Sequence, residues 1–262
     1  MTEPRYLHGH HHSVLRSHRW RTAENSAAYL LPVLRPSMRL LDVGCGPGTI
    51  TADLAGRLPD GMVVGIDASA TVLADARAAA PGVAFVAADL FDLPFAAGSF
   101  DVIHLHQVLQ HLADPVAALQ ALRPLLAPGG VLAARDADYG AMSWSPASPG
   151  LDRWLELYEA CGRGVGGEPD AGRHLVAWAE SAGMRDVVGS MSHWTFSSLE
   201  DRAWWGSLWA ERMRRSALAD TAVALGLADR DELEVLAESW EAFAALPQAR
   251  FVVPHGEILC GA

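Results

Sequence analysis

Asp42 stands two residues before three glycines spaced two apart, Gly44, Gly46 and Gly48, in the otherwise largely apolar run 40–50. Glycines after a buried strand let the backbone turn tightly and let a ligand approach it closely. The spacing departs from the dinucleotide pattern G-x-G-x-x-G, because Thr49 occupies the place of the third glycine of that pattern. A nucleotide-like cofactor is expected here, and residues further along the chain indicate which one.

The next two apolar runs also end in carboxylates. Asp67 ends the run 62–67, 23 residues after Gly44, and Asp89 ends the run 83–89. In a parallel sheet, the carboxyl ends of neighbouring strands meet the same ligand. We therefore expect Asp67, followed by Ala68, to accept hydrogen bonds from ribose hydroxyls, although it could instead cap the next helix. Asp89 is expected to accept from an adenine amine, flanked by Ala88 and Leu90, and the alternative is that it only caps a turn.

Strand and helix patterns alternate from residue 38 to 138. Strands are expected at 39–43, 62–66, 83–87, 100–105 and 131–135, helices near 49–57, 70–80 and 115–126, and a sharp turn at 127–130. This alternation predicts an α/β fold with a mostly parallel sheet covered by helices on both faces.

Five motifs in this order resemble those of class I S-adenosylmethionine-dependent methyltransferases. The subgroup that they resemble contains the quinone-biosynthesis C-methyltransferases and many small-molecule methyltransferases. The motifs are LDVGCGPG at 41–48, GID at 65–67, ADL at 88–90, FDVI at 100–103 and LAPGG at 126–130. The resemblance implies a Rossmann-like sheet of seven strands with an antiparallel last strand, helical lid elements, and S-adenosylmethionine as the cofactor. It also implies that the loop of Gly44, Cys45 and Gly46 faces the methionine part and that Asp42 orients its ammonium group.

The turn after the fourth strand carries polar side chains, among them His106, Gln107 and His111. The resemblance implies that His106 and Gln107 lie against the cofactor near its sulfonium. His111 lies one helical turn beyond Gln107, and its ordinary pKa near neutrality suits a general base. Simple packing of His111 at the helix start is the alternative. Asp136 and Asp138 follow the fifth strand and either face the methyl acceptor or lie in a solvated loop.

The N-terminal segment 1–37 is expected to form a helical lid. Arg21 is a candidate partner for the cofactor carboxylate, because a guanidinium group recognises carboxylates with two hydrogen bonds; a surface ion pair is the alternative. Tyr6 belongs to the same predicted lid. The histidines of residues 8–12 lack the acidic or cysteine partners of a metal site, and we predict no metal.

The predicted cofactor-binding core, 38–138, is followed by a substrate-side region at 139–262. Two late strands, near 187–196 and 250–259, enclose a helical insertion at about 197–248 that holds four of the nine tryptophans. These tryptophans are expected to build a core, or else to wall an apolar acceptor pocket. Arg212, Arg214 and Arg215 are interpreted as a solvated helix face, and attraction of an acidic acceptor is the alternative.

Composition limits the partners of this 262-residue chain. Its net charge is −11 and all twenty basic residues are arginine, which disfavours nucleic acid and anionic membranes as partners. Three widely spaced cysteines provide neither a disulfide framework nor a CxxC metal site. Without an apolar run of membrane-spanning length or a secretory segment, a cytoplasmic protein is expected. A homodimer is one option for the oligomeric state, which the sequence does not decide.

These patterns together predict S-adenosylmethionine-dependent methyl transfer to a small aromatic or apolar metabolite. Two alternatives stay open at this point. One is a non-catalytic, regulatory protein that binds S-adenosylmethionine, and the other is an NAD(P)-dependent oxidoreductase.

Overall fold

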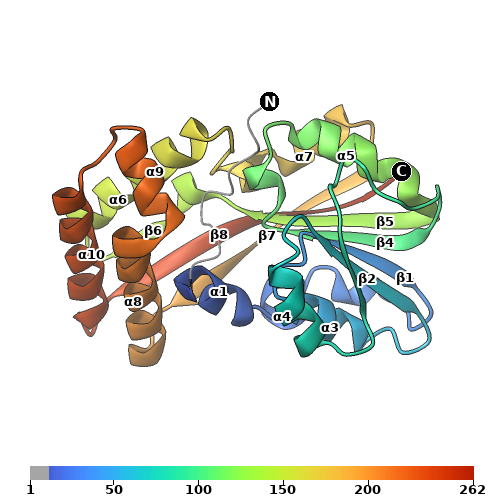
Figure 1. The fold of residues 1–262 in the computed structure, drawn as a ribbon, viewed down its shortest axis with the longest axis horizontal. Coiled ribbons are helices and arrows are strands. Elements are labelled where there is room, and N and C mark those ends of the chain that lie inside the picture. Colours follow the sequence, from blue (N-terminus) through green and yellow to red (C-terminus); the bar gives the residue numbers. More distant parts are fainter. Residues whose placement is uncertain (1–11) are drawn as a thin grey trace.

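The computed structural model describes residues 12–262, and an eight-stranded sheet runs through its length (Figure 1). Five strands are parallel and lie in the order β3-β2-β1-β4-β5: β1 (Arg39–Val43), β2 (Met62–Asp67), β3 (Ala84–Ala87), β4 (Phe100–His106) and β5 (Leu126–Ala137). β8 (Arg250–Gly261) is antiparallel to β5 and also pairs with β6 (Ser143–Ser145) and β7 (Arg185–Phe196). The predicted fold class is confirmed, and the short β6 adds one strand to the seven expected.

Helices cover both faces of the parallel strands. α3 (Thr49–Ala55) and α4 (Val72–Ala79) lie on one face, while α5 (Pro115–Leu122) and α7 (Ala171–Ser181) lie on the other (Figure 1). α1 (His12–Arg19), α2 (Ala23–Ser26) and the 3₁₀ turn η1 (Leu31–Val33) precede β1. Further 3₁₀ turns are η2 (Leu109–His111), η3 (Arg123–Leu125) and η4 (Tyr139–Ala141).

The remaining helices gather at one end of the sheet (Figure 1). They are α6 (Pro149–Gly164), α8 (Leu199–Arg215), α9 (Ala217–Ala224) and α10 (Arg230–Ala245), and the last three lie between β7 and β8 in the chain. Trp154, Trp209 and Trp240 are almost fully buried there, with the ring centroid of Trp154 at 4.6 Å from that of Trp209 and 4.8 Å from that of Trp240. Three of the four tryptophans of the insertion, Trp205, Trp209 and Trp240, are buried in this cluster and form a core, as the sequence predicts.

The first strand places apolar side chains on both faces of the sheet. Leu40 packs with α2 and α3 on one face of the sheet, whereas Leu41 and Val43 pack toward α5 and α7 on the other. A parallel strand covered on both faces has no solvent side, and so it lacks the alternation of an exposed strand. The carboxyl end of this strand leads directly into the glycine loop.

The expected sharp turn at 127–130 lies inside β5. The pairing with β4 passes from Phe100–Leu126 to Val102–Val131, so that residues 127–130 stand out from the ladder, and Gly129 has a φ of +75°. Among the helices of residues 12–262, none is both long and apolar enough to cross a bilayer. Tyr6, His8, His10 and His11 lie outside the described residues.

Candidate active site

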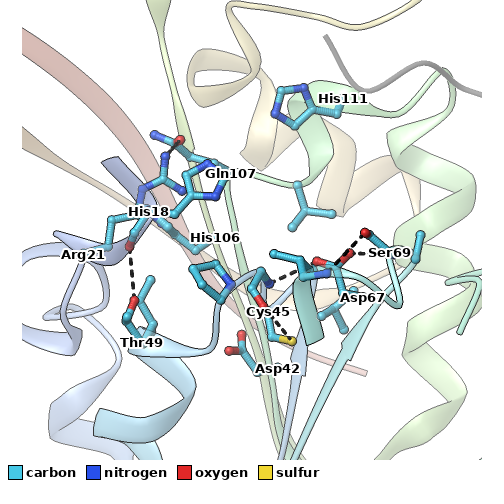
Figure 2. A pocket seen from close by; sticks show the side chains of 18 of the residues that line it. His18, Arg21, Asp42, Cys45, Thr49, Asp67, Ser69, His106, Gln107 and His111 are labelled. Atoms are coloured by element: carbon cyan, nitrogen blue, oxygen red, sulfur yellow. Dashed lines mark hydrogen bonds between the residues drawn. The ribbon is translucent and has the colours of Figure 1, made fainter. Parts of the chain in front are cut away.

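One cavity of about 920 Å³ opens where β1, β2, β3 and β4 end (Figure 2). All thirteen side chains or glycines that the sequence predicted for the site line this cavity. They are Arg21, Asp42, Gly44, Cys45, Gly46, Asp67, Ala68, Ala88, Asp89, Leu90, His106, Gln107 and His111. Because parallel strands end at the same edge of the sheet, residues from four separate segments converge here.

The glycine loop brings bare backbone to the cavity. Gly44, Gly46 and Gly48 have φ values of +67°, +54° and +77°, a left-handed conformation that other residues rarely adopt. A Cβ on Gly44 would lie 2.5 Å from Cγ2 of Val108. These positions are therefore glycine for two reasons: the turn needs left-handed backbone, and at Gly44 the segment after β4 leaves no room for a side chain.

Asp67 connects the end of β2 to the glycine loop. One carboxylate oxygen accepts from the backbone N–H of Gly46 at 3.0 Å, and the other accepts from that of Ser69 at 2.8 Å (Figure 2). Asp67 is not the cap of α4, which begins at Val72 after Thr71. The carboxylate instead links the end of β2 to the glycine loop, and its remaining lone pairs can accept from a ligand in the cavity.

Asp42 is buried below the loop. Its two carboxylate oxygens contact Oγ1 of Thr51 at 2.5 Å and Nδ1 of His104 at 2.7 Å. These contacts offset the cost of burying the carboxylate, which is 3% exposed. Asp42 therefore reaches the cavity with its orientation already set by the protein.

Asp89 lies at the open side of the cavity. Its Oδ1 accepts from the backbone N–H of Phe91 at 2.9 Å, so it does cap the turn after β3. It is nevertheless exposed and lines the cavity together with Ala88 and Leu90. The turn contact thus leaves the carboxylate beside the predicted adenine position.

Cys45 lines the cavity beside Asp42 and Asp67. Burial, reinforced by the charges of these two carboxylates, raises the pKa of its thiol far above the usual range. Because the nucleophilic form of cysteine is the thiolate, Cys45 packs as a neutral side chain.

His106 presents a neutral imidazole to the cavity. Burial lowers its pKa well below 6.5, and the nearby Arg21 and Arg135 lower it further. Among the described residues, neither ring nitrogen has a hydrogen-bond partner, although the side chain is only 6% exposed. A buried polar group of this kind is costly unless a ligand or water meets it.

Gln107 is held between two other site groups. Its Oε1 accepts from Nη2 of Arg21 at 2.6 Å, and its Nε2 lies 3.0 Å from Nε2 of His255. The φ of Gln107 is +54°, which is uncommon for a residue with a side chain. Arg21 also lies over the ring of Trp194, with its Cζ 5.6 Å from the centroid. Residues that follow α1 and β4 thus meet residues of β7 and β8 at this corner of the cavity.

His111 lies at the other side of the cavity mouth, on η2 (Figure 2). Burial lowers its pKa to about 3, with a smaller effect from the charge of Arg21. Its Nε2 lies 3.0 Å from Nε2 of Gln110. His111 is therefore neutral at physiological pH, but a pKa this far below neutrality makes it a weaker proton acceptor than the ordinary histidine that the sequence suggested.

The interpretation of Asp136 and Asp138 is wrong in both of its forms. Asp136 is fully buried within β5 and accepts from the backbone N–H of Gln110 at 3.2 Å. Asp138 forms an ion pair with Arg173. Neither carboxylate is among the residues that line the cavity. Asp136 is buried because β5 extends to Ala137, further than the sequence indicated, and Asp138, just after β5, is only 5% exposed.

The interpretation of the arginines on α8 as one solvated face is wrong for Arg212. Arg214 forms surface ion pairs with Glu234 and Glu241, and Arg215 is exposed. Arg212 is 4% exposed and lines the cavity. The position of α8 against α1 decides this difference, which the helix pattern alone did not show.

The polar groups that line the cavity fit a ligand made of a nucleoside linked to an amino acid. Three carboxylates at successive strand ends can accept from hydroxyl and amine groups. A ligand can approach the backbone of the glycine loop closely. S-adenosylmethionine has no phosphate group, so the N-terminus of the helix after the loop would face the methionine part instead. Together with a cavity of this size, these residues suit S-adenosylmethionine.

The fold and this site define a class I S-adenosylmethionine-dependent methyltransferase. A family model described as "Methyltransferase domain" matches residues 34–182, and the chain belongs to this family. The oxidoreductase alternative is therefore rejected.

Full-length similarity supports the same assignment. An uncharacterised methyltransferase of Schizosaccharomyces pombe is 31% identical over 269 residues, which cover 97% of this chain and 95% of the relative. A putative methyltransferase from Bacillus halodurans has a similar fold, with a TM-score of 0.57, 18% identity, and coverage of 89% of this chain and 96% of that chain. A Haemonchus contortus phosphoethanolamine N-methyltransferase, solved with phosphomonomethylethanolamine and S-adenosylhomocysteine, has a TM-score of 0.52 at 17% identity and covers 87% of this chain and 49% of that chain. The cofactor of the present protein is S-adenosylmethionine.

Several residues of the site were not predicted from the sequence. His255 and Gln110 contact predicted site residues, while Met142 lines the cavity. Trp205 also lines it, in agreement with the alternative that late tryptophans wall a pocket. Polar residues inside the apolar last strand, at 255 and 257, were the only signal for His255.

Proposed function

We propose that this methyltransferase acts on a small aromatic or apolar metabolite. The cavity supports this proposal, because its wall beyond the cofactor loop contains the aromatic rings of Trp20, Trp194 and Trp205. Flat apolar walls favour flat apolar ligands through dispersion and burial. In this proposal, residues 1–37 and 139–262 surround the acceptor, while 38–138 hold the cofactor.

Each predicted residue has one role in the proposed cofactor site. Asp67 accepts from the ribose and Asp89 from the adenine amine, with Ala68, Ala88 and Leu90 around the ring. Gly44 and Gly46, beside the neutral Cys45, leave room for the methionine part. Arg21 binds its carboxylate, Asp42 orients its ammonium group, and His106 and Gln107 lie near the sulfonium.

When bound, the cofactor supplies an electrophilic methyl group on a positively charged sulfur. The protein then has to align the acceptor with that methyl group and exclude water, and alignment of this kind contributes several kcal/mol or more. His111 takes the proton of an acceptor that is still protonated when it reacts. Acceptors that are already ionised need no such base.

Ligand-dependent unfolding tests the cofactor site. S-adenosylhomocysteine should raise the melting temperature, because it binds the folded state only, whereas NAD should not. Absence of a shift with S-adenosylhomocysteine would contradict the proposed site.

Turnover tests the rest of the proposal. The protein should transfer label from methyl-labelled S-adenosylmethionine to at least one member of a panel of aromatic and apolar metabolites. A protein that binds S-adenosylhomocysteine but labels no acceptor would instead fit the non-catalytic alternative.

A further inference from the structure

Trp194 on β7 contacts the segment that carries Arg21. Its Nε1 donates to the backbone carbonyl oxygen of Asn25 at 2.6 Å, although 169 positions separate the two residues. Its ring stands edge-on to the ring of Trp20, with the centroids 5.2 Å apart. The segment between α1 and α2 is therefore attached to β7 at two points.

Asn25 holds the backbone on both sides of Arg21. Its Nδ2 donates to the carbonyl oxygen of Trp20 at 3.1 Å, and its Oδ1 accepts from the backbone N–H of Thr22 at 2.8 Å. Arg21 lies between these two residues in the chain. The hydrogen bond from Trp194 to Asn25 thus restrains the backbone from which the Arg21 side chain extends.

The guanidinium group of Arg21 also contacts Trp194. Its Cζ lies 5.6 Å from the centroid of the ring, within the range of a cation–π contact. An arginine side chain is long and loses conformational freedom when it binds a ligand, and contacts that hold it beforehand reduce this loss. The ring of Trp194 therefore adds to the hydrogen bond that Gln107 makes with the same group.

Buried groups of the sheet hold Trp194 itself. The centroid of its ring lies 4.3 Å from that of His255 on β8 and 4.9 Å from Cζ of Arg135 on β5. Arg135 forms an ion pair with Glu257 at 3.3 Å, and both side chains are almost fully buried. These contacts fix the ring relative to the sheet, so that Trp194 can hold Arg21 in one place.

We propose that Trp194 is a positioning residue for recognition of the cofactor carboxylate. It acts through Arg21, because it restrains both the backbone and the guanidinium group of that residue. This inference rests on the proposed function, in which Arg21 binds the carboxylate of the methionine part.

Two ligands that differ in the carboxylate alone test the proposal by calorimetry on the full chain. S-adenosylhomocysteine has this group, and S-adenosyl-3-thiopropylamine lacks it but keeps the adenosine, the sulfur and the amine. The natural chain should bind the first ligand at least about fivefold more tightly. Trp194→Leu should weaken binding of S-adenosylhomocysteine about three- to fivefold, as expected for one cation–π contact, and leave the affinity for the decarboxylated ligand unchanged.

Three further variants assign the effect. Trp194→Phe keeps a smaller ring without the N–H donor, and the ratio of the two affinities should fall about twofold. Trp204→Leu is the matched control, because Trp204 also packs against Trp20, with centroids 5.4 Å apart, but is not among the cavity-lining residues. It should leave the ratio unchanged. In the Arg21→Met background, Trp194→Leu should no longer change the ratio.

The outcomes separate this proposal from the proposed function. If S-adenosylhomocysteine does not bind the natural chain, or if Arg21→Met leaves the ratio unchanged, the proposed cofactor site fails and this inference with it. If Arg21→Met lowers the ratio but Trp194→Leu weakens both ligands equally, or neither, only the inference about Trp194 is overturned. A Trp194→Leu chain that binds neither ligand leaves the decision to Trp194→Phe, in which an unchanged ratio overturns the inference. A loss in Trp204→Leu equal to that in Trp194→Leu overturns it as well.

Discussion

Gln107 and His255 meet side chain to side chain although 148 positions separate them, and their Nε2 atoms are 3.0 Å apart. Nδ1 of His255 lies 3.0 Å from the carbonyl oxygen of Val253, which can only accept, so Nδ1 carries the proton and Nε2 accepts. The amide of Gln107 must then donate to His255 and direct its oxygen to Arg21. The tautomer of one buried histidine thus decides which end of the Gln107 amide faces Arg21.

This chain of contacts predicts coupling between His255 and Arg21. His255→Phe keeps an aromatic ring but removes the acceptor, and Arg21→Met removes the charge. Each change should weaken S-adenosylhomocysteine binding about fivefold, near the net contribution of one hydrogen bond. In the double variant, His255→Phe should have little further effect, because Arg21 is already absent. Fully multiplicative losses in a calorimetric double-mutant cycle would show that His255 and Arg21 act on binding independently and would contradict the coupling.

Asp67 is predicted to make the largest contribution to binding of the ribose. Asp67→Asn should weaken S-adenosylhomocysteine binding by about 10- to 100-fold, because a charged acceptor is replaced by an amide. The matched control is Asp92→Asn, an exposed carboxylate that is not among the cavity-lining residues. Equal affinities of the two variants would remove Asp67 from the cofactor site.

Gly44 and Gly226 allow backbone strain to be separated from a steric clash. Both have a φ of +67°, but an added Cβ meets Val108 at 2.5 Å in Gly44 and nothing within 4 Å in Gly226. Gly226→Ala should cost about 1–2 kcal/mol of unfolding free energy and leave cofactor affinity unchanged. Gly44→Ala should lose stability and also most cofactor affinity, measured by denaturant unfolding and calorimetry. Normal affinity in Gly44→Ala would contradict close approach of the loop to the cofactor.

His111 and His106 should separate catalysis from binding. With an acceptor that is protonated before reaction, His111→Asn should lower kcat by about 10²- to 10⁴-fold, the usual contribution of a general base. Its affinity for S-adenosylhomocysteine should change little. His106→Asn should mainly weaken cofactor binding. An unchanged kcat in the His111 variant would leave that histidine with a packing role.

Stability should decrease as the pH falls from 7 to 5. His106 and His255 are buried with pKa values well below 6.5, so below pH 6.5 the unfolded chain binds protons that the folded chain excludes. Each histidine then lowers the unfolding free energy by up to about 1.4 kcal/mol per pH unit. Asp136 opposes this trend, because burial raises its pKa from 3.8 to about 7 and the folded chain holds the extra proton in this range.

The variant Asp136→Asn tests this balance of signs. It removes the opposing contribution, and unfolding free energies from denaturant titrations should then fall more steeply with acidification than in the natural chain. A flat dependence in both proteins, or a shallower one in the variant, would contradict the assignment.

Local sequence was sufficient to predict the cofactor side. The left-handed turns at Gly44 and Gly46 are properties of the residues themselves, and a carboxylate at the end of each successive parallel strand reaches the same edge wherever the helices pack. For this reason Asp42, Asp67 and Asp89 could be placed together before the structure was known.

The acceptor side depended on the tertiary structure. Arg212 and Arg215 are three residues apart on one helix, yet the first lines the cavity and the second is exposed, because α1 packs over only one of these positions. Asp136 and His255 look like ordinary polar residues in the sequence and are buried by the pairing of β5 with β8. Sequence alone thus identified S-adenosylmethionine as the methyl donor and predicted that the glycine loop and the strand-end carboxylates lie together, because local conformation and strand order decide both. The surroundings of the other part of the cavity were decided by contacts between distant elements. Their packing determines which polar groups are buried, which of them are charged, and which line the cavity.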